Sequence, residues 1–240
     1  SVHSITKFVK KSYAGPLFKK EISAINLVIK NKKEPVTCII GGSKISTKIN
    51  VIKNLISKFD NLIFVGGMAN NILKNKKFQI GKSIFEENCD HIVKDIFNLS
   101  KKENCKIIYP VDVSVSKKKD GEGKVKKISE VQEDDLILDI GPETLKILTK
   151  TIEKSKTVLW NGPAGYFENE NFSRGTLSIA ENISKNTIEK SLISILGGGD
   201  TLAALNKMKN KLSFSHLSTA GGAFLEYLEG KDLPGISVLK

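Results

Sequence analysis

The sequence contains few residues of the kinds that form disulfide frameworks or metal sites. Its 240 residues include three cysteines and three histidines, which are scattered along the chain without a C-x-x-C pair. An odd number of widely separated cysteines argues against a disulfide-stabilised domain and against a zinc site. This cysteine usage is typical of a reducing compartment, so we expect the protein to be cytoplasmic.

The sequence also lacks long hydrophobic runs. No apolar stretch approaches the roughly 18 to 20 residues that cross a bilayer, so we expect no membrane partner. The first residues, SVHSITKFVKKSYAGPLF, do not contain the apolar core of a signal peptide. Because the sequence does not begin with methionine, we expect it to start inside a longer chain.

Arginine is almost absent, and lysine supplies nearly all of the positive charge. The formal net charge is +12, with Arg174 as the sole arginine. Such an excess attracts anions in general, including nucleic acids and phosphorylated small molecules. The aromatic content is 7%, and no RRM, KH or zinc-finger signature is present. We therefore expect most lysines to be solvated and expect no nucleic-acid partner.

Short apolar runs that end near glycine alternate with helical patterns along most of the chain. The runs lie at residues 36–42, 62–67, 106–113, 136–142, 157–165, 192–200 and 214–222. Continuous apolar strands followed by helices are typical of a parallel sheet that is buried on both faces. We predict a doubly wound α/β fold, with a mostly parallel sheet and helices on both faces in a Rossmann-like three-layer domain.

Two segments depart from this alternation. Residues 16–31 begin with proline and carry apolar residues at helical spacing, which predicts an amphipathic helix. Residues 114–130 are polar around an Asp-Gly pair, which predicts an exposed hairpin. We divide the chain into an amino-terminal segment with a linker helix, residues 1–33, and one domain, residues 34–240.

Glycine stands at the carboxyl ends of five predicted strands. The positions are 41–42, 66–67, 162 with 165, 197–199 and 221–222. In open α/β sheets, ligands bind outside the carboxyl ends of the strands. Glycine lets backbone N–H groups approach a ligand, and helix N-termini favour anions. Each site alone could be a tight turn, but five along one edge predict a phosphate-binding site.

Three side chains beside these glycines are also suited to a phosphate. Lys44 and Lys48 are four residues apart, so on a helix they would share a face near its start, where a bound anion would offset their charge. The spacing is not that of a P-loop. Asp200 could be a helix N-cap or could hold Mg²⁺ beside a phosphate. Its neighbour Thr201 could donate a hydroxyl to a phosphate oxygen.

The stretch LWNGPAGYFENE, residues 159–170, carries groups that suit a nucleoside. Its aromatic side chains could flank a base, and the Glu168 carboxylate could accept hydrogen bonds from ribose hydroxyls. A core tryptophan beside a surface glutamate explains the same residues equally well. Residue chemistry alone therefore reaches an α/β domain that binds a phosphate or a nucleotide.

Seven longer motifs resemble the phosphoglycerate kinase family. They are AGPLFKKEI, GGSKISTKINVIKNL, LIFVGGMANNIL, LDIGPET, VLWNGPAGYFE, GGGDTLAAL and SHLSTAGGAFLEYLEGKDLPG. They occur in family order, cover nearly the whole chain and are most similar to bacterial members. They correspond to the carboxyl-terminal, nucleotide-binding half and to the interdomain helix before it. The amino-terminal phosphoglycerate-binding domain of the family is absent from this sequence.

The resemblance implies a reaction and a set of site residues. The family transfers a phosphoryl group reversibly between 1,3-bisphosphoglycerate and Mg-ADP in glycolysis, giving 3-phosphoglycerate and Mg-ATP. It implies catalytic roles for Lys44, Gly199, Gly221 and Gly222. It implies a nucleotide site formed by Gly42, Ser43, Lys48, Gly66, Gly67, Leu138, Asn161, Pro163, Tyr166, Glu168, Gly198, Gly199, Asp200 and Thr201, with Asp200 as the Mg²⁺ ligand. We expect a monomer that binds ATP or ADP and that catalyses little without the phosphoglycerate-binding domain.

Two residues depart from the family pattern. The triplet Ala220–Gly221–Gly222 stands where three glycines are usual, and Ala220 would strain the loop if its position required a positive φ. Tyr166 stands where a smaller aliphatic residue is common, which would change the packing against a base. A Rossmann-type dehydrogenase and a basic nucleic-acid-binding protein remain the alternatives, although no G-x-G-x-x-G follows a strand.

Overall fold

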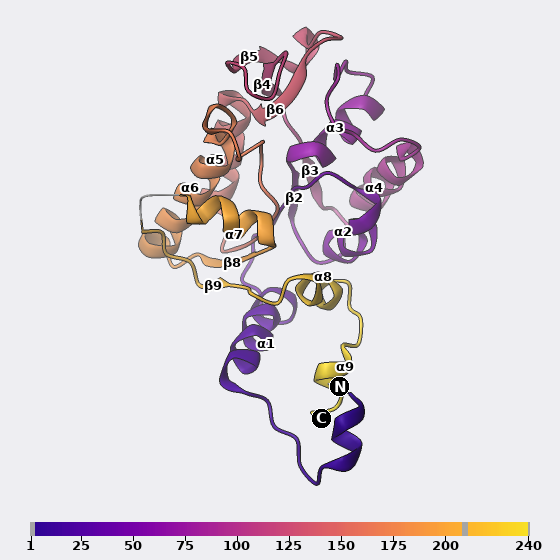
Figure 1. Cartoon of the computed structure of the whole chain (residues 1–240), viewed down its shortest axis with the longest axis vertical. Coiled ribbons are helices and arrows are strands. Elements are labelled where there is room, and N and C mark those ends of the chain that lie inside the picture. Colours follow the sequence, from indigo (N-terminus) through magenta and orange to yellow (C-terminus); the bar gives the residue numbers. More distant parts are fainter. Residues whose placement is uncertain (1–2, 208–210, 240) are drawn as a thin grey trace.

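The computed structural model describes residues 3–207 and 211–239 and contains two sheets (Figure 1). Six strands form a parallel sheet: β1 (Val36–Ile40), β2 (Asn61–Phe64), β3 (Lys106–Ile108), β7 (Thr157–Asn161), β8 (Ile193–Gly197) and β9 (His216–Leu217). Three strands form a separate antiparallel sheet: β4 (Asp112–Ser116), β5 (Lys124–Lys127) and β6 (Leu136–Ile140).

The order of the parallel strands identifies the place where a ligand would bind. The order is β3-β2-β1-β7-β8-β9, and every neighbouring pair is parallel. This corresponds to the 3-2-1-4-5-6 order of doubly wound folds, in which the direction of winding reverses between β1 and β7. The predicted fold class is therefore confirmed. A crevice is expected at the carboxyl ends of β1 and β7, where the two following loops diverge.

Helices cover both faces of the parallel sheet (Figure 1). On one face lie α1 (Pro16–Ile29), α2 (Ile49–Ile56), α3 (Gly66–Asn75), α4 (Asp90–Lys102) and α8 (Gly222–Leu228). On the other lie α5 (Pro142–Lys154), α6 (Arg174–Lys190) and α7 (Gly199–Asn206). The remaining helical segments are short: η1 (Ser4–Phe8), η2 (Ser46–Lys48), η3 (Ile128–Glu130), η4 (Glu170–Phe172) and α9 (Pro234–Ser237).

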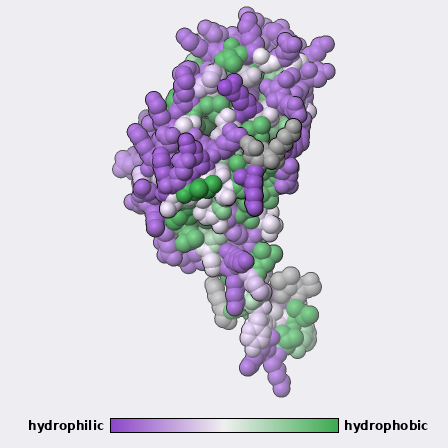
Figure 2. Space-filling model, turned by 90° about the vertical axis from the view of Figure 1, so that its left-hand side faces the viewer, coloured by the Kyte–Doolittle hydropathy of each residue, from purple (hydrophilic) through white to green (hydrophobic). Residues whose placement is uncertain are grey.

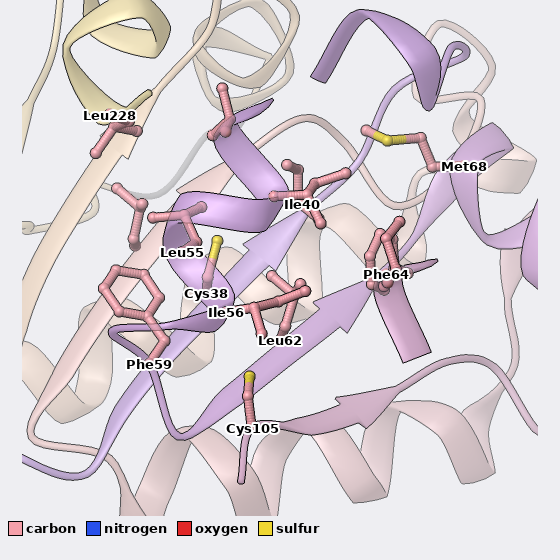
Figure 3. Packing of buried hydrophobic residues seen from close by; sticks show 14 of the residues in the cluster. Cys38, Ile40, Leu55, Ile56, Phe59, Leu62, Phe64, Met68, Cys105 and Leu228 are labelled. Atoms are coloured by element: carbon pink, nitrogen blue, oxygen red, sulfur yellow. The ribbon is translucent and has the colours of Figure 1, made fainter. Parts of the chain in front are cut away.

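The strands form two cores because successive side chains point to opposite faces. Cys38 and Ile40 of β1 pack in the core beneath α2, whereas Ile39, between them, packs in the opposite core. Figure 3 shows Cys38 and Ile40 on the same side of the sheet as Leu62 and Phe64 of β2. All five side chains are almost completely buried. Burial of both faces explains why the strand sequences are continuous apolar runs rather than alternating ones.

The single tryptophan marks the second core beside the winding reversal. Trp160 of β7 is fully buried, and its indole N–H donates a hydrogen bond to the carbonyl of Gly162 at 2.7 Å. Gly162 follows β7 and has a φ of +100°. A Cβ there would lie 2.4 Å from the Gly41 carbonyl oxygen, so the loops after β1 and β7 pack backbone against backbone. Both facts require glycine at position 162.

The assignment of two predicted strands was wrong. The run 136–142 does not join the parallel sheet, because its strand β6 pairs antiparallel with β4. The run 106–113 contributes to both sheets, as β3 and β4, and Pro110 interrupts it. Proline has no N–H to donate to a ladder, which is consistent with a break at this point. The predicted exposed hairpin exists as β4 and β5.

The amino-terminal segment and the carboxyl end form a narrow extension below the main body (Figure 1). Helix α1 joins this extension to the sheet, because Ile25 and Val28 belong to the core that contains α2 and α8. In the segment before α1, large apolar side chains are exposed to solvent, with Phe8 86% and Tyr13 79% exposed. Figure 2 shows hydrophobic surface on this narrow part below a mostly hydrophilic body. None of the helices in the described residues is apolar over the length that a membrane crossing requires.

Candidate functional site

Two adjoining cavities lie at the carboxyl ends of β1, β7 and β8. The small cavity, of about 250 Å³, is lined by Gly41, Gly42, Lys48, Asn161, Gly162, Gly198, Gly199, Asp200, Thr201, Gly221, Gly222 and Leu225. The large cavity, of about 560 Å³, reaches from Gly42 and Ser43 to the antiparallel sheet. Gly42 and Asp200 line both cavities, so one elongated ligand could occupy the two together.

Lys48 is the cation of the small cavity. Its ammonium donates hydrogen bonds to the carbonyl of Gly41 at 2.7 Å and to Oδ1 of Asn161 at 2.9 Å. Burial lowers the pKa of Lys48 from 10.5 to about 8, although Cys38 and Asp200 act to raise it. The protein therefore holds a partly desolvated ammonium whose charge an anion would stabilise.

Asn161 offers a hydrogen-bond donor that the protein leaves unused. Its Oδ1 accepts from Lys48, whereas its Nδ2 is buried and has no hydrogen-bond partner within the described residues. The asparagine is 4% exposed and lies on the wall of the small cavity. A buried donor without a partner is costly, which favours an acceptor-rich ligand at this position.

Helix α7 brings two predicted residues to the small cavity, Asp200 with an exposed side chain and Thr201 with a buried one. Gly198 is its N-cap, so Asp200 lies in the first turn and the N-cap interpretation of this aspartate is wrong. The Asp200 side chain is exposed and accepts no hydrogen bond in the part of the chain that the structure describes. Thr201 is fully buried, and its Oγ1 already accepts a hydrogen bond from the Gly162 N–H at 2.8 Å.

The carboxylate of Asp200 is compatible with a magnesium ion that is shared with a ligand. Among residues 3–207 and 211–239, no group of three or more His, Cys, Asp and Glu side chains could hold a metal by itself. Mg²⁺ is usually held by one or two carboxylates together with phosphate oxygens and waters. Asp200 is one exposed carboxylate on the wall of a cavity that has room for phosphate groups, which meets that requirement.

Lys44 is the predicted site residue that the structure does not place on either cavity. It is exposed in the loop before the 3₁₀ segment Ser46–Lys48, and α2 begins only at Ile49. The prediction that Lys44 and Lys48 share a helical face is therefore wrong, because the chain between them is not α-helical. Lys44 lies two residues after Gly42, which lines both cavities.

The residues predicted to hold the nucleoside meet on the wall of the large cavity. They are Gly66, Gly67, Leu138, Tyr166 and Glu168, and two further predicted nucleotide-site residues, Ser43 and Pro163, line the same cavity. Sequence reasoning did not find Asn70, Lys82 and Lys119, which line the same cavity. Lys119 comes from the predicted hairpin, and its ammonium lies 5.5 Å from the centroid of the Tyr166 ring. Asn70 lies within the motif LIFVGGMANNIL, although it was given no role there, whereas Lys82 and Lys119 lie outside the motifs.

The loop before α8 does not contain the strain that its sequence suggested. Among the described residues, positive φ angles in this loop occur at Gly221, at +58°, and not at Ala220. Alanine at position 220 therefore adopts an ordinary backbone conformation, and the expected strain is absent. Gly221 and Gly222 line the small cavity at the start of α8.

Comparison with known proteins gives one consistent family. Residues 1–231 match the family model described as phosphoglycerate kinase. A phosphoglycerate kinase from Zymomonas mobilis is 44% identical over 231 residues, which are 95% of this chain and 58% of that relative. One from Francisella tularensis is 41% identical over 242 residues, which cover 100% of this chain and 61% of that relative.

Solved structures give the same result. The structure of a phosphoglycerate kinase from Coxiella burnetii matches with a TM-score of 0.93 and 40% identity over 100% of this chain and 62% of that chain. One from Pyrococcus horikoshii matches with a TM-score of 0.82 and 26% identity over 99% and 59%. The chain thus spans between 58% and 61% of the two curated relatives. These similarities favour a kinase over the dehydrogenase and nucleic-acid alternatives.

Proposed function

The chain belongs to the phosphoglycerate kinase family, and on this premise we propose that its two cavities bind one Mg-nucleotide, ADP or ATP. The complete enzyme would transfer a phosphoryl group reversibly between 1,3-bisphosphoglycerate and ADP, giving 3-phosphoglycerate and ATP. The observation that carries this proposal is the junction at Gly42 and Asp200, where a large cavity with apolar walls meets a small cavity lined by glycines.

The two cavities suit the two ends of a nucleotide. The large cavity would hold the adenine between Gly66, Gly67 and Leu138. Tyr166 would lie beside the adenine, and the ribose would lie near Glu168.

The small cavity would hold the phosphate chain against Lys48 and the free Nδ2 donor of Asn161. Backbone N–H groups at the starts of α7 and α8 add further donors, through Gly199, Gly221 and Gly222.

This arrangement fits a reaction that depends on positioning and on neutralisation of charge. In phosphoryl transfer the protein has little covalent chemistry to perform, so it stabilises charge on the group in transit. Lys48 and the glycine amides would act on that charge. Lys44 is exposed two residues after Gly42, and its ammonium would stay with the phosphoryl group as that group is transferred. Mg²⁺ on Asp200 would neutralise phosphate oxygens.

The remaining portion of the relatives would supply the phosphoglycerate site. This chain covers 58% of the Zymomonas relative, so a complete enzyme of that length contains a further part. We expect the 240-residue chain to bind Mg-nucleotide and to turn over slowly by itself, as a cytoplasmic monomer. Turnover near that of a complete relative in a coupled assay would contradict this part of the proposal.

Calorimetry with Mg-ADP tests the phosphate end of the site. Lys48→Ala should weaken binding by about tenfold or more, because it removes the buried ammonium of the small cavity. Lys118→Ala is the matched control, because Lys118 is exposed on the hairpin and lines neither cavity. Equal affinities of the two variants would exclude the site.

Asp200→Ala tests the position of the metal. The variant should bind ADP with an affinity that no longer increases when Mg²⁺ is added, because the carboxylate at the cavity junction is gone. The measurement is a pair of ADP titrations with Mg²⁺ and with excess chelator, in both proteins. An unchanged effect of Mg²⁺ in the variant would remove Asp200 from the metal site.

A further inference from the structure

Asp139 is a buried carboxylate in the lining of the large cavity, and the proposed binding roles assign nothing to it. It lies on β6, next to Leu138, and is 3% exposed. Aspartate is almost never buried to this degree without partners. Its neighbours therefore indicate what the carboxylate holds in place.

The backbones of two other segments, the start of α6 and the loop at Gly165, lie against this carboxylate. Oδ2 accepts a hydrogen bond from the N–H of Gly175 at 2.7 Å, in the first turn of α6, and Oδ1 accepts from the N–H of Ile140 at 2.9 Å. A Cβ on Gly165 would lie 2.4 Å from Oδ1, and a Cβ on Gly175 would lie 2.2 Å from it. The carboxylate thus fills the space between the start of α6 and the loop at Gly165.

That loop carries the residues expected to contact the nucleoside. Thr176, one residue after Gly175, accepts the N–H of Ala164 on its Oγ1 at 2.9 Å. The N–H of Tyr166 donates to the carbonyl of Leu138 at 2.7 Å. The contacts therefore form a closed circuit from β6 to α6, from α6 to the loop, and from the loop back to β6. Tyr166 and Glu168 extend this loop along the cavity wall.

We propose that Asp139 is a positioning residue for the nucleoside half of the site, acting through Gly175 and Gly165 on the loop that bears Tyr166 and Glu168. This inference rests on the proposed function, because it takes a nucleoside as the occupant of the large cavity. The phosphate half of the site does not depend on this circuit, because Lys48 and Asn161 stand on η2 and β7.

The charge of Asp139 supplies an independent readout. Burial raises its pKa from 3.8 to about 7, against the lowering effects of the Gly175 and Ile140 N–H groups and of Arg174. On α6 the charged group near Asp139 is Arg174, and on the loop the titratable groups are Tyr166 and Glu168. The residue of β4 that pairs with Asp139 is Ser114, which carries no charge. A proton on the carboxyl would weaken its acceptor role and add a donor, so the loop should be held less firmly near pH 6 than near pH 8.

Asp112 provides a matched control with the same local chemistry. It is 4% exposed on β4, and its carboxylate accepts the N–H groups of Glu143 at 2.9 Å and Thr144 at 2.7 Å, at the start of α5. It lines a separate groove with Lys127 and Lys146, not the large cavity. Asp112→Asn therefore removes a buried, helix-bound carboxylate without altering the circuit at Gly165.

The test compares ligands that occupy one half of the site or both. Wild-type protein, Asp139→Asn and Asp112→Asn are titrated at pH 8 with Mg-ADP, with adenosine and with tripolyphosphate. Asp139→Asn should lose about tenfold in affinity for ADP and adenosine, the equivalent of about one hydrogen bond, and less than twofold for tripolyphosphate. Asp112→Asn should change all three affinities by less than twofold.

The outcomes separate this inference from the proposed function. Wild-type protein that fails to bind ADP would overturn both. If wild-type protein binds ADP, two results would overturn the role of Asp139 alone. The first is an equal loss of affinity for adenosine and tripolyphosphate in Asp139→Asn, and the second is no loss of affinity for either ligand. If Asp139→Asn does not fold, the wild-type affinity for adenosine, which has no titrating group in this range, is measured from pH 8 to pH 6. It should fall at least threefold, and a flat profile would overturn the inference.

Discussion

The buried ammonium of Lys48 should make the stability of the protein depend on pH in a way that a single substitution removes. Burial lowers the pKa of Lys48 from 10.5 to about 8 in the folded protein. Between these values the unfolded chain binds more protons than the folded one at this position, so stability should rise with pH. At neutral pH, the charge on Lys48 costs roughly 3 kcal/mol of folding free energy.

Lys48→Met removes this contribution while keeping a side chain of similar length. The variant leaves the Gly41 carbonyl and the Asn161 Oδ1 without their donor, which costs about 1–3 kcal/mol for each and opposes the gain from removing the charge. The sign of the difference at one pH is therefore not decisive, but its slope is. Wild-type protein should gain about 2 kcal/mol relative to the variant between pH 7 and pH 9.5.

Urea unfolding followed by circular dichroism at several pH values measures this slope. Other titrating groups are common to both proteins and cancel in the difference. Lys118→Met, which replaces an exposed lysine on the hairpin, is the control and should show no slope relative to wild type. A difference between wild type and Lys48→Met that stays constant within about 0.5 kcal/mol over this range would refute the reasoning.

Two further predictions concern the loop before α8 and its anchor. Because Gly221 has a φ of +58° and Ala220 has no positive φ, Gly221→Ala should destabilise the protein by about 1 kcal/mol or more, whereas Ala220→Gly should cost at most about 1 kcal/mol through the unfolded chain. Thermal unfolding of both variants checks the order, and a stabilising Ala220→Gly would contradict it. Burial alone would raise the pKa of Glu21, but hydrogen bonds from His216, Thr219 and Ser218 lower it below its ordinary value. The ionised carboxylate therefore stabilises the folded protein at pH values above its ordinary pKa, and this stabilisation is lost as the pH falls through the lowered pKa. Glu21→Gln should therefore lower the unfolding free energy by about 1–3 kcal/mol at pH 7 and by less near pH 4, and an equal loss at both pH values would count against this assignment.

The sequence predicted the parallel sheet well because burial on both faces leaves a clear pattern. Strands β1, β2, β7 and β8 each begin within one residue of the start of an apolar run, and glycine follows β1, β7 and β8 as the turn at each requires. The run that became β6 has the same appearance, yet it pairs with the hairpin. A strand's own residues do not specify its partner, because pairing depends on which surfaces meet in the folded chain.

The site residues illustrate the same limit. Gly42, Asn161 and Asp200 were found from motifs, and the fold brings them together. Lys44 and Lys48 do not share a helical face, because the chain between them forms a loop and a 3₁₀ turn where their spacing suggested an α-helix. Asp139 was overlooked, although an aspartate inside an apolar strand is itself an unusual signal. Its role depends on α6, which is distant in sequence.

The position of Trp160 gives this protein an intrinsic optical reporter. As the single tryptophan it is the one source of indole emission, and it sits in a dry environment with its N–H tied to the Gly162 carbonyl. The N–H of Gly162 donates to Oγ1 of Thr201, so the fluorophore is joined to the turn that follows β7 and, through it, to the start of α7. Emission maximum and quenching should therefore follow rearrangement of that turn, and ligand titrations can be read from unlabelled protein.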